Sequence, residues 1–298
     1  MGKSKSEIKE CYRTFDKTIK NLVRMGKMGT SNIFYGRKDR NPLLPEDYEP
    51  TKEQDKNPSL SGNYESTQEQ DKNVMSTESV KWKTVKSDMS KFINRGYGSA
   101  RHIARQYVKA AGGSHRMASQ SFAGKKAGAN IGSFFYGIVN NGVELTFQNF
   151  GITYAGKSVE EIFSVLVDLI SSDSNTKEDI VAKEATQMAL IKVYDYVEAN
   201  GMDIKCIDNM PLELMNEVLK EYVGSYIWIT MMKDLGSRLE MYIANSDDAF
   251  AIECEFKDMI MGIVDVEFDK QGNIINQNVS DAINSLYERC LNVLEGIL

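Results

Sequence analysis

Apolar residues recur at intervals of three and four from about residue 85 to the C terminus, and this spacing restricts the fold more than any other feature. The interval places one stripe of side chains on one face of an α-helix, whereas a strand requires strict alternation. Pro211 suits the first turn of a helix, and Gly112 and Gly113 are expected to end one. Helices are predicted near residues 100–111, 159–170, 177–199, 211–226 and 280–297. The predicted fold class is therefore all-α.

Two local features stand out within this helical region. Gly124, Gly128 and Gly132 form a small-residue face, and because glycine in a helix costs up to about 1 kcal/mol relative to alanine, we expect another backbone to approach it closely. The apolar run Ala127 to Val139 is shorter than the roughly 18 residues that a bilayer span needs, so no membrane role is expected. Val264 to Ile275 is expected to form a small hairpin around Gln271-Gly272-Asn273.

The first 80 residues have a different composition. Residues 4–24 carry one apolar stripe and predict an amphipathic helix. Residues 48–73 contain a tandem duplication, YEPTKEQDKNPSLSGN followed by YESTQEQDKN, that is too polar to bury a core and is predicted to be disordered. The predicted organisation is an N-terminal amphipathic helix or leader (1–28), a flexible arm with a glycine motif (29–47), a disordered repeat linker (48–80) and an all-α domain (81–298).

Charge is segregated along the chain. Residues 81–126 hold eleven Lys or Arg against one acid, while residues 127–298 carry a net charge of −17, within a total of −6. The basic block therefore predicts contact with something negative, which could be nucleic acid, an acidic partner or the chain's own acidic half. The candidate contact residues are Arg101, Arg105, Lys109, Arg116, Lys125 and Lys126.

Motifs for catalysis are absent from the sequence. The two histidines, His102 and His115, lie in the basic block with only Asp88 nearby to orient them, which indicates surface or phosphate-contacting residues. No phosphate-binding loop occurs, and the four cysteines are widely spaced without any C-x-x-C pair, which is typical of small core residues in a reducing cytosol. We therefore expect a cytoplasmic protein that is not an enzyme, with no cofactor and no metal.

Three stretches resemble a known family. They are Met28-Gly29-Thr30-Ser31 followed by Pro42-Leu43-Leu44-Pro45, the long segment from Gly98 to Ile152, and Leu235-Gly236-Ser237-Arg238. In length and order these are similar to QatB, the B component of the bacterial Qat anti-phage defence system. The resemblance implies a four-gene cassette with an ATPase, a 7-cyano-7-deazaguanine synthase-like (QueC-like) component called QatC, and a TatD-like nuclease.

The resemblance also implies a role for the glycine motif. Many family members begin near Met-Gly-Thr-Ser, whereas 27 residues precede Met28 here, so a free amine at Gly29 requires trimming or a later translation start. A synthase-like enzyme joins an amine to an activated carboxylate, and an α-amino group with a pKa near 8 is partly neutral in the cytosol. Gly29, Thr30 and Ser31 are then the modification or processing site. In the alternative, Gly29 only ends the first helix.

Two main functions follow. The first is a non-enzymatic adaptor and substrate protein that binds the QueC-like component and presents Gly29, with Pro42, Leu43, Leu44 and Pro45 as the partner peptide. The second is a nucleic-acid-binding module that uses the basic block without sequence preference. A membrane-active effector built on the glycine-rich segment 124–142 is a third class.

Overall fold

The computed structural model describes residues 80–95, 98–171, 176–242, 246–272 and 278–297. The predictions for residues 1–79, which cover the amphipathic helix, the glycine-motif arm and the repeat linker, lie outside these residues. Within them every regular element is a helix, which confirms the all-α fold class.

The chain order is α2 (Trp82–Arg95), α3 (Ala100–Ala110), α4 (Ser114–Gln120), α5 (Phe122–Asn149), α6 (Val159–Ser171), α7 (Lys177–Ala199), the 3₁₀ turn η1 (Ile204–Asn209), α8 (Leu212–Tyr242), α9 (Ser246–Gln271) and α10 (Val279–Glu295). The helices predicted from the apolar spacing all appear among these.

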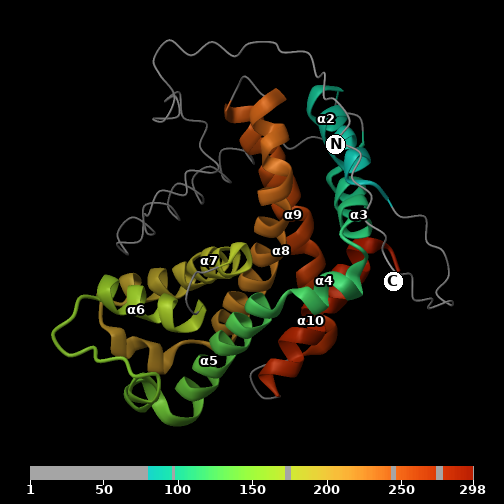
Figure 1. Cartoon of the computed structure of the whole chain (residues 1–298). Coiled ribbons are helices and arrows are strands. Elements are labelled where there is room, and N and C mark those ends of the chain that lie inside the picture. The colour runs from blue at the N-terminus through green and yellow to red at the C-terminus, as the bar shows by residue number, and fades with distance from the viewer. Residues whose placement is uncertain (1–79, 96–97, 172–175, 243–245, 273–277, 298) are drawn as a thin grey trace, which may run out of the picture.

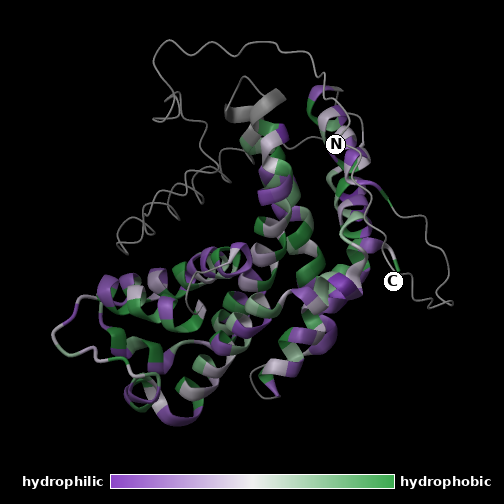
Figure 2. Ribbon diagram, in the orientation of Figure 1, coloured by the Kyte–Doolittle hydropathy of each residue, from purple (hydrophilic) through white to green (hydrophobic). Residues whose placement is uncertain are grey.

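The long helix α8 organises the molecule. It packs against α7, α9, α2 and α5, and Glu221 of α8 forms ion pairs with both Lys192 of α7 and Lys257 of α9. In Figure 1, α5, α6 and α7 gather on one side of α8, while α2, α3, α4 and α10 lie on the other side. Figure 2 shows hydrophobic and hydrophilic residues interspersed along these helices, and the hydrophobic residues Ile131 and Leu286 are among those that are fully buried. One apolar core therefore runs through both groups of helices.

Polar caps and glycines set the helix boundaries that matter for the site. The Ser99 hydroxyl accepts a hydrogen bond from the His102 amide at 3.2 Å and starts α3. Gly112 and Gly113 follow α3 with positive φ angles of 98° and 92°, as expected for residues that end a helix. Thr176 and Asp179 form a reciprocal capping box at the start of α7. The first turns of α4 and α7 are thereby fixed in place.

A kink divides α5. Gly142 has φ 76° and ψ 172°, which breaks the helical backbone inside Phe122–Asn149. The Asp208 carboxylate, from η1, accepts a hydrogen bond from the Val143 amide at 2.5 Å. Asp208 therefore caps the second half of α5 as an N-cap residue would.

The glycine face of α5 is packed tightly, but not against a backbone as predicted. A Cβ atom built on Gly124 would lie 2.1 Å from the Tyr226 ring, and one on Gly132 would lie 1.9 Å from Val279. The neighbours are side chains of α8 and α10, so the glycines make room for a tyrosine ring and a β-branched residue rather than for a second helix axis.

The hairpin predicted at Val264 to Ile275 is wrong for the residues that the structure describes. Residues 264–271 continue α9, and Gly272, with φ 73°, ends the helix. Val264 and Phe268 are buried while Val266 is 56% exposed, which is helical rather than alternating burial. Residues 273–277 lie outside the described ranges.

Candidate functional site

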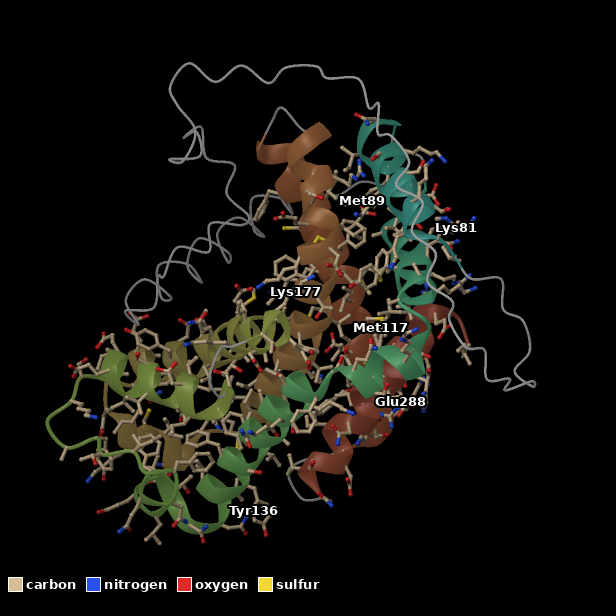
Figure 3. The ribbon with its side chains drawn as sticks, in the orientation of Figure 1. Lys81, Met89, Met117, Tyr136, Lys177 and Glu288 are labelled. Carbon is tan, nitrogen blue, oxygen red and sulfur yellow. The ribbon has the colours of Figure 1, made fainter. Side chains whose placement is uncertain are left out.

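A pocket with a volume of about 550 Å³ opens where the two groups of helices meet. Its walls come from α2, α3 and α4 on one side and from α7 and α8 on the other. Figure 3 shows Lys177 and Met117, from opposite walls, near the centre of the molecule. The pocket is lined by Trp82, Tyr107, Ala110, Ala111, Arg116, Met117, Gln120, Ser121, Lys177, Glu178, Val181, Tyr226, Thr230 and Asp234.

One wall is built around Asp234 of α8. Its carboxylate accepts a hydrogen bond from the Tyr107 hydroxyl at 2.7 Å and forms an ion pair with Lys177. Burial, reinforced by the neighbouring Asp234, raises the pKa of Tyr107 well above its ordinary value. Tyr107 therefore stays a protonated donor at neutral pH and ties α3 to α8.

The same wall continues around Glu178 of α7. Its carboxylate accepts hydrogen bonds from the Ala123 amide at 2.7 Å, the Gly124 amide at 3.3 Å and the Tyr226 hydroxyl at 3.2 Å. A carboxylate at this position satisfies the free amides of the first turn of α5 and complements the helix dipole. Burial, followed by the nearby Tyr287 and Glu178, raises the pKa of Tyr226. At the floor of the pocket, Glu178 and Tyr226 are therefore held by these hydrogen bonds.

The rim offers groups that are still available. Arg116 and Gln120 are exposed, and Trp82 is 39% exposed while its ring meets that of Tyr107 edge-on at 5.2 Å. Arg116 makes no ion pair with any residue inside the described ranges. The arrangement can hold an apolar group on the aromatic floor and an anionic group at the cationic rim.

The six predicted cationic residues lie on three consecutive helices. Arg101, Arg105 and Lys109 form a stripe along α3, as their spacing of four predicts, Arg116 lies on α4, and Lys125 and Lys126 lie near the start of α5. Lys109 and Lys125 are half-buried, and the other four are exposed. We call these six residues the basic face. Only Arg116 among them lines the pocket.

The basic face meets the acidic half of the chain at helix ends. Glu295 of α10 accepts a hydrogen bond from the Ser114 amide at 2.7 Å, at the first turn of α4. The Arg105 guanidinium lies against Gly296, where a cation is favourable at the C-terminal end of α10. Among the described residues, no ion pair joins residues 81–126 to residues 127–298. Within the described ranges, the two regions therefore meet through hydrogen bonds and helix-end contacts.

An exposed aromatic side chain accompanies the cations. Phe122 is 72% exposed at the start of α5, within four residues of Lys125 and Lys126 along the chain. Phe122 is the most exposed large apolar side chain among the described residues, and aromatic residues are enriched at the centres of protein interfaces.

The remaining candidate residues can be placed only in part. Gly29, Thr30, Ser31 and the peptide 42–45 lie outside the described residues. His102 is exposed and its Nε2 lies 3.7 Å from Asp88, and neither histidine lines the pocket.

Searches of the described residues define the site further. No cluster of metal-ligating side chains occurs in that part of the chain. No helix there combines the length and the apolar composition that a bilayer crossing requires. Cys206 and Cys290 carry free thiols.

Most of the pocket is not evident in the sequence. Arg116 was a predicted contact residue, but the contacts of Tyr107 with Asp234 and of Glu178 with Tyr226 join residues 127 and 48 positions apart. No local spacing marks such pairs. The one usable signal is an acid in the first turn of α7, which the sequence analysis did not connect to a cap on a different helix.

Comparisons with known proteins identify a family for this chain. No curated protein and no solved structure matches the chain. A family model, described as Qat anti-phage system associated protein QatB, matches residues 112–294. The matched residues begin just after α3 and run from α4 to nearly the end of α10. They include the parts of the pocket that α4, α7 and α8 contribute. Because the match covers more than half of the sequence, the chain belongs to the QatB family of anti-phage defence components.

Proposed function

We propose that this chain is a non-enzymatic adaptor of the Qat system. It binds the 7-cyano-7-deazaguanine synthase-like component through its helical body and presents residues 29–45 to it, with Gly29, Thr30 and Ser31 as the modified or processed motif. Family membership supports a role inside a multi-component defence system. The ATPase and the TatD-like nuclease are further candidate partners.

The observation that carries the adaptor is the combination of Phe122 with cations on α4 and α5 that form no ion pair among the described residues. Interface centres are enriched in aromatic residues and arginine, and a ring exposed by 72% gains most when a partner covers it. Arg116 and Lys126 lie within six residues of Phe122 along the chain. Their positive charge suits an acidic partner surface.

Co-purification tests this surface. We expect the full chain to form a one-to-one complex with the synthase-like component, and Phe122→Ala/Lys126→Glu to weaken it at least tenfold. The matched control is Leu145→Ala/Lys157→Glu, because Leu145 is 54% exposed and Lys157 is exposed without an ion pair among the described residues. An unchanged complex with the first variant would place the contact elsewhere, and the absence of any complex would overturn the adaptor.

Mass spectrometry tests the glycine motif separately. After co-expression with the synthase-like component, we expect a peptide that starts at Gly29 and carries added mass. Gly29→Ser is the control, because it keeps a small residue at this position but adds a side chain to the carbon that bears the amine. A chain that keeps an unmodified Met1 terminus under these conditions contradicts modification at Gly29.

A second candidate function, nucleic-acid binding, is favoured by the exposed stripe of Arg101 and Arg105 on α3. Binding through phosphates would ignore sequence and weaken steeply between 50 and 200 mM salt, as expected when about six contacts each release a counterion. A binding isotherm on duplex DNA at these two salt concentrations checks it. No binding at 50 mM salt rejects this candidate and leaves the adaptor in place.

A further inference from the structure

We propose that the pocket between α4 and α7 is a docking site for residues 42–49 of this same chain, Pro-Leu-Leu-Pro-Glu-Asp-Tyr-Glu. The proposal rests on the lining of the pocket, on the position where the described part of the chain begins, and on the composition of the segment. It does not depend on the adaptor function.

The lining fits a proline-rich peptide. The aromatic rings of Trp82, Tyr107 and Tyr226 contribute to the pocket together with the apolar side chains of Met117 and Val181. Proline-rich segments dock in aromatic-lined grooves because their backbone is already extended and loses little entropy on binding. The volume of about 550 Å³ accommodates a few side chains of such a peptide rather than a folded element.

The rim fits the acidic end of the segment. Glu46, Asp47 and Glu49 follow directly after the Pro-Leu-Leu-Pro stretch. Arg116 has no ion-pair partner among the described residues and is exposed at the rim. Seating the two leucines on the floor therefore places carboxylates next to an arginine that has room for them.

The chain enters the described structure beside this pocket. Its first described residue is Val80, and Trp82, two residues later, lines the rim. The 30 residues between Glu49 and Val80 include the polar repeat. The sequence predicts that these residues are disordered, and a disordered chain of that length has a root-mean-square span of about 30 Å, which gives an effective concentration on the order of 1 mM. A weak site is enough to be filled under these conditions.

Docking gives the segment two alternative positions. If the synthase-like component takes the same peptide, which is the proposed function, it has to displace the peptide from this pocket. The free chain would then keep Leu43 and Leu44 covered until the partner arrives.

Trp82 is a built-in reporter of docking in the full chain. The chain has two tryptophans, and the other, Trp228, is buried, so Trp228→Phe leaves a single probe on the rim. We expect Leu43→Ser/Leu44→Ser to raise acrylamide quenching of Trp82 at least twofold, and Arg116→Glu to raise it similarly. Leu60→Ser, in the repeat linker, is the matched control and should leave quenching unchanged. Equal quenching in all four proteins overturns the proposal, provided that circular dichroism shows each to be folded.

Crosslinking gives a second, independent readout. Tyr48→p-benzoylphenylalanine keeps an aromatic ring and adds a photoreactive group beside the docked segment. Irradiation of the full chain, without any partner protein, should link this position to α2, α4 or α7. A mixture of ¹⁵N-labelled and unlabelled chains then identifies the source. Links within one chain support docking in cis, whereas links between the two isotopic forms, or links elsewhere on the molecule, overturn it.

Discussion

At the scale of single residues, the helical body depends on glycines that leave space for large neighbours. Gly132 lies where any side chain would overlap Val279 of α10. Glycine is needed there although its helix propensity is low. A Cβ atom added to Gly262 of α9 would lie in open space, with nothing from the other described residues beyond its own helical turn within 4 Å, so the same residue type has no packing role there.

These two positions predict opposite effects of alanine. Gly132→Ala overfills the α5–α10 contact and should destabilise the protein by about 1–3 kcal/mol. Gly262→Ala should stabilise it by up to about 1 kcal/mol through helix propensity alone. Thermal unfolding followed by circular dichroism checks both, since 1 kcal/mol corresponds to a shift in Tm of roughly 2–4 °C for a body of this size. Two shifts of the same sign would contradict the packing described here.

A second residue-scale prediction concerns Cys290. Burial, with the nearby Glu267, raises the pKa of its thiol to about 12. Because the thiolate is the reactive form, Cys290 should resist thiol reagents at pH 8 in the folded chain. Cys206 is only half-buried and should react at least tenfold faster. Mass spectrometry of the labelled cysteines measures the ratio, and equal labelling rates in the folded chain would contradict it.

At the scale of elements, the contact of α8 with α10 is lined with buried tyrosines. The rings of Tyr226 and Tyr287 meet at 5.5 Å, and Tyr287 shares a hydrogen bond of 2.7 Å with Ser121. Burial, as the largest cause, raises the pKa of Tyr222, Tyr226 and Tyr287 above the ordinary value. These groups keep their protons in the folded state at pH values where the unfolded chain loses them.

This layer predicts alkaline unfolding. Above about pH 9 these tyrosines begin to ionise in the unfolded chain but not in the folded one, so the free energy of unfolding falls as the pH rises. The contribution of these buried tyrosines to stability is fully present below about pH 9. We expect Tm to drop between pH 7.5 and pH 10.5, and tyrosine ionisation at 295 nm to coincide with loss of helix. Ionisation of these tyrosines in a chain that remains helical would contradict the prediction.

The kink in α5 gives a further element-scale prediction. Asp208→Ala removes the cap on Val143 and should cost about 1 kcal/mol, as for other N-cap substitutions. Glu144→Ala is the control, because Glu144 is exposed next to the same amide and makes no contact of this kind among the described residues. Urea unfolding compares the two. An equal effect of both substitutions would show that Asp208 does not hold the second half of α5.

Elements were predictable from the sequence where one periodicity dominates. The stripe of α3 was found because Ile103, Tyr107 and Val108 share one buried face. The end of α9 was missed because Val264, Val266 and Phe268 alternate as in a strand, and only packing against the rest of the core shows that Val266 faces solvent. The pocket was not predictable, because its hydrogen bonds join helices that tertiary packing alone brings together.

At the scale of the whole molecule, the division at residue 80 makes a prediction. The core of the described body is continuous from α2 to α10, so the body should fold without residues 1–79. Deletion of these residues should change Tm by no more than about 3 °C, equivalent to roughly 1 kcal/mol. Scanning calorimetry of both proteins checks it, and a much larger loss would show that the first 79 residues belong to the folded core.

Glu178 gives the molecule one more property. The same carboxylate forms part of the pocket wall and holds the amides of Ala123 and Gly124. A molecule bound in the pocket that attracts the Glu178 carboxylate would weaken its hydrogen bonds to these amides and loosen the first turn of α5, which leads to Lys125 and Lys126. Binding inside the pocket would then change the basic face on the surface. The expected sign is faster hydrogen exchange of the Ala123 and Gly124 amides.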